Sequence, residues 1–238
     1  MHIKGLQKVT LLDYPGKIAC TVFLGGCNFR CPFCHNGSLV LPDRMGQDIP
    51  VEDFFAFLDA RRGRLQGVCV SGGEPTLHPD LPWLLGEIKA RGYEVKLDTN
   101  GTDPEMLLSL INDGLVDYVA MDIKNSPEKY ALTAGVNLNA ECRMQNAELI
   151  DRVRESASLL MQGRVDFEFR TTLMRELHTV EDMHSIGRWL EGSERLFLQT
   201  YREEGDLIIG GFTPFTKGET EALLEVLRKY LPNAEIRE

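Results

Sequence analysis

The sequence lacks long hydrophobic runs and an excess of positive charge. It contains no stretch of about 18 consecutive apolar residues, so we expect no membrane-spanning helix. The N-terminal segment MHIKGLQKVTLLDYPGK has no long apolar stretch of the kind found in secretory signals, so we expect a cytoplasmic protein. The formal net charge of −10 argues against a general nucleic-acid-binding protein.

Cysteine is also sparse, with six in 238 residues. In a cytoplasmic chain, cysteines bind metals or take part in catalysis more often than they form disulfides. Cys20 and Cys69 lie in the apolar runs IACTVFL and GVCVS, which predicts two buried hydrophobic side chains. In contrast, the segment GGCNFRCPFCHNG brings Cys27, Cys31 and Cys34 together with the spacing C-x-x-x-C-x-x-C. This cluster is the first candidate for a functional site.

Short β-type runs alternate with amphipathic stretches of helical period. Strands are expected at 18–24, 67–71, 93–98, 117–122, 165–173 and 195–201, and helices at 51–62, 80–91, 104–113, 144–161, 180–191 and 217–231. Asp103 before Pro104, and Thr216 with Glu219, mark two of the helix starts. Six β–α units form a parallel sheet, and without a dinucleotide-binding glycine fingerprint they favour an open or partial barrel. With no repeat or linker, residues 1–238 are expected to form a single α/β domain, a partial (β/α)6 TIM-like barrel.

Polar residues follow the ends of successive expected strands. These residues are the Ser71-Gly72-Gly73-Glu74-Pro75 segment after the second strand, Asp98 and Thr99 after the third, Asp122 and Lys124 after the fourth, and Arg170 late in the fifth. The cysteine segment follows the first strand. The carboxyl ends of parallel barrel strands meet at one rim, where such folds carry their active sites, so we expect all these groups to converge.

Several chemistries can use closely spaced cysteines. A structural zinc site needs four ligands, and His35 would have to be the fourth directly beside Cys34. Cys31 to His35 matches the C-x-x-C-H motif of c-type haem attachment, and Cys31 with Cys34 matches a thioredoxin-like dithiol, but both leave Cys27 without a role. A 4Fe–4S cluster held by three thiolates uses all three cysteines and leaves one iron open to another ligand. The cluster is therefore the leading interpretation.

The cysteine segment resembles that of the radical S-adenosylmethionine (SAM) enzymes. Phe33, before the third cysteine, matches the apolar residue that the family places near the adenine, and Ser71, Gly72, Gly73 and Glu74 match its SAM-binding turn. The resemblance implies that Cys27, Cys31 and Cys34 hold one 4Fe–4S cluster and that SAM chelates the open iron. It implies reductive cleavage of SAM to methionine and a 5′-deoxyadenosyl radical, with a flavodoxin or ferredoxin as the electron donor. The remaining cysteines are too few for a second cluster.

A narrower resemblance concerns the substrate. Residues 11–40 resemble the activating proteins of anaerobic ribonucleoside-triphosphate reductase, whereas LDTNG (97–101) and MDIK (121–124) resemble pyruvate formate-lyase activating enzymes. Both groups imply abstraction of a glycine Cα hydrogen, which installs a glycyl radical on a partner enzyme. Anaerobic ribonucleoside-triphosphate reductase is the leading partner. The alternatives are another glycyl-radical enzyme, a small-molecule radical SAM reaction, and a non-catalytic iron–sulfur or zinc protein.

The resemblance also suggests roles for the other residues at the rim. Asp98, Thr99 and Asp122 match the residues that bind a monovalent cation in the related activases, and oxygen ligands suit such ions. Asp122 and Lys124 also match residues near the ribose and carboxylate of SAM. Arg170 lies in an otherwise apolar strand, so it is expected to meet either the SAM carboxylate or a neighbouring acid such as Glu168.

Overall fold

The computed structural model describes residues 1–136 and 142–237, and the side chains of 142–146 are not part of that description. Eight strands in this part of the chain form one sheet in sequence order. They are β1 (Ile3–Thr10), β2 (Ala19–Leu24), β3 (Gly67–Gly72), β4 (Glu94–Thr99), β5 (Tyr118–Asp122), β6 (Asp166–Leu173), β7 (Leu196–Thr200) and β8 (Glu235–Arg237). β1 is antiparallel to β2, and every later pair is parallel. β1 and β8 are the two edges, so the barrel is open.

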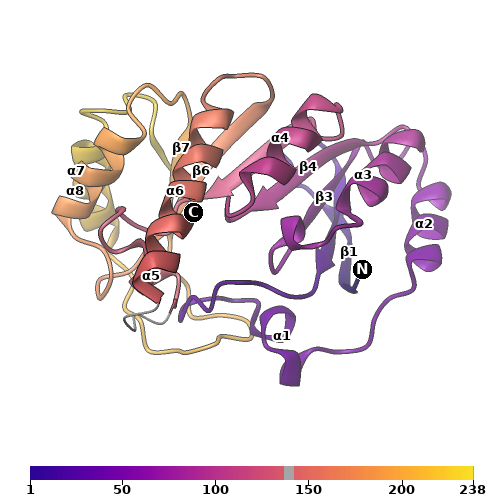
Figure 1. The fold of residues 1–238 in the computed structure, drawn as a ribbon, viewed down its shortest axis with the longest axis horizontal. Coiled ribbons are helices and arrows are strands. Elements are labelled where there is room, and N and C mark those ends of the chain that lie inside the picture. Colours follow the sequence, from indigo (N-terminus) through magenta and orange to yellow (C-terminus); the bar gives the residue numbers. More distant parts are fainter. Residues whose placement is uncertain (137–141, 238) are drawn as a thin grey trace.

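Helices follow one another around the outside of the curved sheet, from α2 to α8 (Figure 1). The helices are α1 (Gly37–Val40), α2 (Val51–Ala60), α3 (Leu81–Ala90), α4 (Pro104–Asn112), α5 (Tyr130–Thr133), α6 (Cys142–Leu160), α7 (Val180–Trp189) and α8 (Lys217–Leu227), with short 3-10 turns at Pro42–Arg44 and Pro75–Leu77. Their apolar faces pack on the sheet and form the main hydrophobic core. None of the described helices is long and apolar enough to cross a membrane.

Local signals in the sequence explain these boundaries. The capping box expected at Thr216 and Glu219 is present at the start of α8, and Asp103 accepts a hydrogen bond from the backbone of Met106 at the start of α4. All six expected strands and all six expected helices are present within a few residues of their expected bounds. The expected count of six strands was incomplete, because the antiparallel strand β1 and the parallel strand β8 flank the six expected strands.

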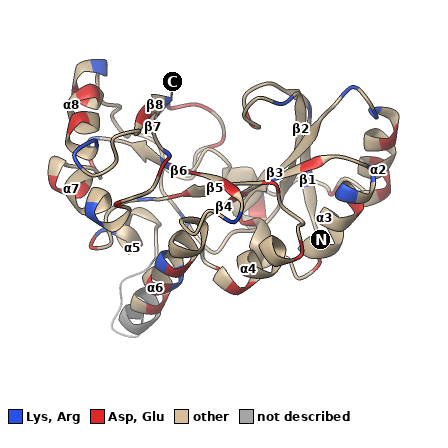
Figure 2. Ribbon diagram, turned by 90° about the horizontal axis from the view of Figure 1, so that it is seen from above, with Lys and Arg blue, Asp and Glu red and all other residues tan. Residues whose placement is uncertain are grey.

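Side chains alternate between two environments along each parallel strand. In β4, Val95 and Leu97 face the helices, whereas Lys96 and Asp98 face the interior of the barrel, because successive residues of a strand point to opposite sides. The same alternation puts Asp122 of β5 inside the barrel. Figure 2 marks charged residues on several strands of the sheet. Of these, Asp98, Asp122 and Arg170 line the pocket inside the barrel.

Candidate functional site

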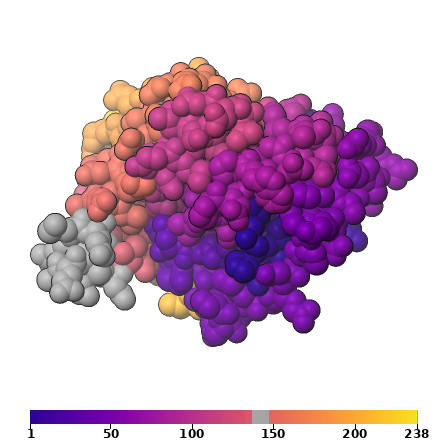
Figure 3. All heavy atoms as spheres, turned by 45° about the vertical axis from the view of Figure 1, so that its right-hand side comes forward, coloured from indigo at the N-terminus to yellow at the C-terminus, as the bar shows by residue number. Residues whose placement is uncertain are grey.

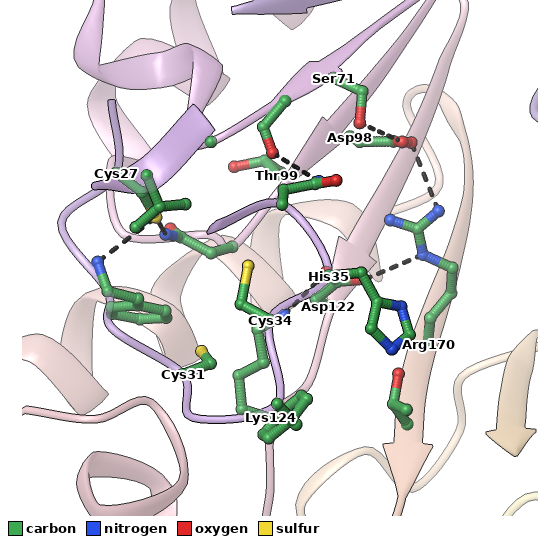
Figure 4. A pocket seen from close by; sticks show the side chains of 18 residues that line it. Cys27, Cys31, Cys34, His35, Ser71, Asp98, Thr99, Asp122, Lys124 and Arg170 are labelled. Atoms are coloured by element: carbon green, nitrogen blue, oxygen red, sulfur yellow. Dashed lines mark hydrogen bonds and ion pairs between the residues drawn. The ribbon is translucent and has the colours of Figure 1, made fainter. Parts of the chain in front are cut away.

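A pocket opens at the carboxyl ends of the parallel strands (Figure 4). Its volume, counted out to the open mouth, is about 890 Å³. It is lined by Cys27, Phe29, Cys31, Phe33, Cys34, His35, Asn36, Val40, Ser71, Gly72, Gly73, Asp98, Thr99, Asn100, Asp122, Lys124, Arg170 and Thr172. The expected convergence at one rim thus occurs, and it includes every residue that the sequence assigned to the site except Glu74. The space-filling view in Figure 3 shows the N-terminal half of the chain forming much of one face of the molecule.

The cysteine segment leaves β2 and runs along this pocket as a loop tied down by backbone bonds. The Arg30 amide donates to the carbonyl of Ala134 at 3.0 Å, and the Cys34 amide donates to the carbonyl of Cys31 at 3.0 Å. The Phe29 amide donates to the Cys27 sulfur at 3.3 Å. Figure 4 shows the three cysteine side chains around a common space. The loop therefore holds three cysteine sulfurs, which are candidate metal ligands, on a hydrogen-bonded backbone.

Burial keeps these thiols protonated. It raises the pKa of Cys27 to about 12 and that of Cys31 to about 11, and it raises the pKa of Cys34 as well. The Lys124 ammonium acts in the opposite direction on all three. Metal binding requires thiolates, so loading this site must release protons, and the nearby positive charge favours that release.

The turn after β3 is joined to the cysteine loop through its backbone. Gly72 has φ +124°, and a Cβ there would lie 2.2 Å from the carbonyl oxygen of Leu24. At Gly73 a Cβ would lie 1.9 Å from the carbonyl oxygen of Gly26. The Glu74 amide donates to that same Gly26 carbonyl at 2.8 Å. Two main chains can approach this closely because neither glycine carries a side chain.

Glu74 is the one expected site residue whose carboxylate turns away from the pocket. It is 1% exposed, and its two oxygens accept four hydrogen bonds from Thr76, Thr99 and Asn100. Burial raises its pKa, against these donors, which lower it. Glu74 therefore fastens the glycine turn to the segment that follows β4.

Charged side chains line the opposite wall of the pocket. The guanidinium of Arg170 donates from Nε to Asp122 at 2.9 Å, and Lys124 donates to the other oxygen of Asp122 at 2.9 Å. Burial alone would raise the pKa of Asp122, but these two cations lower it well below its usual range. Arg170 does not pair with Glu168, which instead binds Arg237 through two contacts of 2.7 Å. Arg170 therefore pairs with Asp122 on β5 and, at 3.5 Å, with Asp98 on β4.

The sequence matches a family model for the radical SAM superfamily over residues 21–173. The chain belongs to the radical SAM superfamily. It is 32% identical over 99% of its length to a protein of Methanocaldococcus jannaschii provisionally named a glycyl-radical enzyme activating enzyme, and covers 95% of that protein. The pyruvate formate-lyase-activating enzyme of Listeria monocytogenes is 36% identical over 54% of this chain and 56% of the relative. The 7-carboxy-7-deazaguanine synthase of Neisseria meningitidis is 35% identical over 46% and 45%.

Solved radical SAM structures share the fold. Streptococcus suis SuiB bound to S-adenosylmethionine superposes with a TM-score of 0.66 at 14% identity, covering 91% of this chain and 51% of that chain. TYW1 with a lysine–pyruvate adduct has a TM-score of 0.60 at 16% identity, covering 90% and 73%. The chain thus spans about half of SuiB, and the likeness supports the α/β fold with its parallel sheet.

Membership of the radical SAM superfamily implies a 4Fe–4S cluster and SAM, and the pocket fits both. Thiolates are the ligands that iron–sulfur clusters use, and three of them line one side of the cavity. Among the side chains described, those of residues 1–136 and 147–237, no three His, Cys, Asp or Glu groups lie close enough to hold a single metal ion. A polynuclear cluster spans larger gaps between its ligands than a single ion does. The remaining polar wall offers charged groups to an amino acid moiety.

The radical SAM site also contains asparagines that sequence reasoning missed. Asn36 donates from its amide to the carbonyl of Gly72 at 3.1 Å, linking the cysteine loop to the glycine turn. Asn100 is buried and donates to the side chain of Asn28 at 2.9 Å. Asn100 belongs to the LDTNG motif, and Asn36 follows the cysteine motif. Their nearness to these motifs was the sequence feature that could have identified them as site residues. Their partners are distant in sequence and gave no local pattern.

Proposed function

We propose that this chain is a glycyl-radical activase that cleaves SAM reductively and takes a hydrogen atom from a glycine Cα of a partner enzyme. The observation that carries the proposal is the match over 99% of the chain to the Methanocaldococcus jannaschii protein, joined to a pocket with three thiols and a glycine turn. Cys27, Cys31 and Cys34 would hold a cluster that supplies one electron for cleavage of the bond between the SAM sulfur and C5′, with methionine as one product; the 5′-deoxyadenosyl fragment would take the glycine hydrogen and leave as 5′-deoxyadenosine.

Each group of side chains has a distinct task in this proposal. Cys27, Cys31 and Cys34 hold the cluster and leave one position for SAM. The main chain of Gly72 and Gly73 lines the pocket and receives the amino group of the methionine portion. Ser71 carries a hydroxyl at this edge of the pocket, and Phe33 contributes an apolar ring toward the adenine.

The charged wall orients the other end of the same ligand. Lys124 and Arg170 are paired with Asp122, yet both line the pocket, where they can also face the carboxylate of SAM. The aromatic rings of Phe33 and Phe212 contact each other at a centroid distance of 6.4 Å and limit water beside the cluster loop. The open edge of the barrel leaves a route by which a glycine-bearing loop can reach the pocket.

The proposed partner is an anaerobic ribonucleoside-triphosphate reductase, because residues 11–40 resemble the activating proteins of that enzyme. A second candidate is a pyruvate formate-lyase type partner, which the partial match to the Listeria monocytogenes enzyme favours. The proposed electron donor is a flavodoxin or ferredoxin. A small-molecule reaction is less well supported, because the match to the deazaguanine synthase covers 46% of the chain.

Anaerobic reconstitution tests the proposal in two stages. The protein is loaded with iron and sulfide, reduced, and supplied with SAM, and 5′-deoxyadenosine is measured by chromatography. Candidate partners labelled with deuterated glycine are then added. Unlabelled partner run in parallel is expected to give a glycyl doublet in the electron paramagnetic resonance spectrum. With the Cα-deuterated partner that splitting should collapse, and deuterium should appear in 5′-deoxyadenosine. Cleavage of SAM without either signal, across both partner classes, would reject the activase assignment while leaving SAM chemistry intact.

Two variants provide the matched comparison. Cys31→Ala removes a cluster ligand and should abolish 5′-deoxyadenosine formation. Cys20→Ala changes a fully buried cysteine that does not line the pocket, and it should retain iron content and product formation. Equal activity of the two variants would reject the ligand assignment.

A further inference from the structure

Asp98, expected to bind a monovalent cation, is already surrounded by donors. Oδ1 of Asp98 accepts from the ammonium of Lys96 and lies 3.5 Å from Nη1 of Arg170. Oδ2 accepts the hydroxyl of Ser71 at 2.9 Å. Burial alone would raise the pKa of Asp98, but the nearby cations lower it, so the side chain is an anion. Both oxygens are therefore occupied by groups of this chain.

The other two expected ligands are engaged in the same way. Asp122 gives one oxygen to Arg170 and the other to Lys124, each at 2.9 Å. The Thr99 hydroxyl donates to Glu74 at 2.8 Å, inside the glycine turn. The Thr99 oxygen also accepts from the Gly101 amide at 3.1 Å, so every side-chain oxygen of this described set already accepts a hydrogen bond from the chain.

The charge balance points in the same direction. Two acidic side chains, Asp98 and Asp122, face three basic side chains, Lys96, Lys124 and Arg170. A sodium or potassium ion would enter a cluster that already carries a surplus of one positive charge, which is unfavourable in a buried site. The same surplus suits an anionic group at the pocket wall.

Lys96 is the residue that distinguishes this arrangement. It is 1% exposed, and its place on β4 aligns it with Cys69 and Tyr118, beneath the level of Asp98. A buried ammonium is costly unless an anion balances it, and the salt-bridge partner of Lys96 among the described residues is Asp98. Asp98 in turn aligns with Ala120, whose short side chain leaves space for Arg170 to reach across from β6.

We propose that Lys96 is a positioning residue that takes the place of a bound monovalent cation, so that SAM binds without one. Its ammonium fixes Asp98 as an anion, and Asp98 holds Arg170 toward the pocket. The inference rests on the SAM-binding part of the proposed function and does not depend on the partner enzyme.

The first test uses the reconstituted wild-type protein. The dissociation constant of SAM is measured by equilibrium dialysis in potassium, sodium and tetramethylammonium chloride at equal ionic strength. The proposal expects the three constants to agree within about twofold, since the fixed charges do not exchange with the buffer. Binding that is about tenfold weaker in tetramethylammonium and restored by potassium or sodium would overturn it while leaving the SAM site established.

The second test replaces the ammonium with an uncharged group of similar length. Lys96→Met should weaken SAM binding about tenfold in tetramethylammonium, and potassium should restore most of it by occupying the vacated volume. In Lys96→Met with Asp98→Asn, the anion is also absent and potassium should have no effect. Lys89→Met removes an ammonium paired with Asp117 outside the pocket and should leave SAM binding unchanged.

Either of two results with the variants would overturn the proposal. One is Lys96→Met binding SAM as the wild type does in tetramethylammonium. The other is weakened binding that neither potassium nor sodium restores, which would make Lys96 a purely structural residue. Binding of potassium is followed independently through the thallium resonance of thallium(I) used as a substitute, which should broaden with Lys96→Met and not with the wild type. If Lys96→Met does not fold, the wild-type comparison decides.

Discussion

Replacing Glu74 gives a sharp test of how the glycine turn is held. In the structure its carboxylate accepts from the amide of Thr76 at 3.1 Å and from the amide of Asn100 at 2.6 Å. The hydroxyls of Thr76 and Thr99 add contacts of 2.6 and 2.8 Å. Glu74→Ala would leave two buried backbone donors without an acceptor, while the hydroxyls could rotate toward other groups.

The magnitude follows from those two amides. Each buried donor left unsatisfied costs about 1–3 kcal/mol, so loss of the acceptor for two amides in Glu74→Ala should lower the free energy of unfolding by about 2–6 kcal/mol. For a chain of this size that corresponds to a fall in Tm of roughly 4–24 °C. Glu74→Gln keeps the shape, but its NH2 group must face the amide of either Thr76 or Asn100. The Glu74→Gln variant is therefore expected to lose about 1–3 kcal/mol of unfolding free energy.

Urea unfolding of the reconstituted protein, followed by circular dichroism, measures both changes. Glu155→Gln serves as the control, because Glu155 lies exposed on α6 and should change stability by less than about 0.5 kcal/mol. The loss of unfolding free energy should be largest for Glu74→Ala, smaller for Glu74→Gln and smallest for the control Glu155→Gln. Both Glu74 variants should also lose SAM binding. Equal stability of Glu74→Gln and Glu155→Gln would refute this explanation, because it would mean that the buried backbone amides of Thr76 and Asn100 do not need both carboxylate oxygens of Glu74.

Three further outcomes are expected. Gly73→Ala should abolish cluster loading, because the new Cβ would lie 1.9 Å from the carbonyl oxygen of Gly26. Gly46→Ala is the control, because a Cβ at Gly46 meets no atom within 4 Å and the cluster should load normally. Iron analysis after reconstitution compares the two variants. Cys31→Ser should lose most of its iron and its visible absorption, and Cys20→Ser should keep both. Burial alone would raise the pKa of Asp182, but hydrogen bonds from Lys129 and neighbouring hydroxyls lower this pKa below its usual range. The ionised Asp182 therefore stabilises the folded protein above the pKa of an unfolded aspartate, and this contribution disappears as the pH falls below about 4. Asp182→Asn should flatten that acid limb in urea titrations at successive pH values, and an unchanged limb would contradict the assignment.

Local sequence patterns were sufficient to predict the six parallel strands and the surrounding helices. Residues that alternate with period 2 or recur with period 3.6 carry this information in short windows, and the cap at Thr216 acts within four residues. β1 and β8 were missed for a related reason. The segment IKGLQKVT mixes polar and apolar residues, and β8 has three residues, so each becomes a strand through pairing with a neighbour.

The cysteine spacing determined the candidate cluster, and strand ends determined which segments meet at the rim. The tertiary structure was needed to show which charged side chains at the rim pair with one another. The alignment of β5 with β6 places Asp122 opposite Arg170, and this register, rather than the nearness of Glu168 in sequence, selects the ion pair. The same holds for Lys96, which the structure buries inside the barrel and pairs with Asp98.

The sequence by itself therefore determined six of the eight strands of the sheet, the cluster motif and the family, because each depends on residues close together in the chain. The tertiary structure decided which way Glu74 points and which charges neutralise one another. Those outcomes depend on burial, since a buried charge must find a partner within hydrogen-bond distance, and strands separated by tens of residues supply that partner.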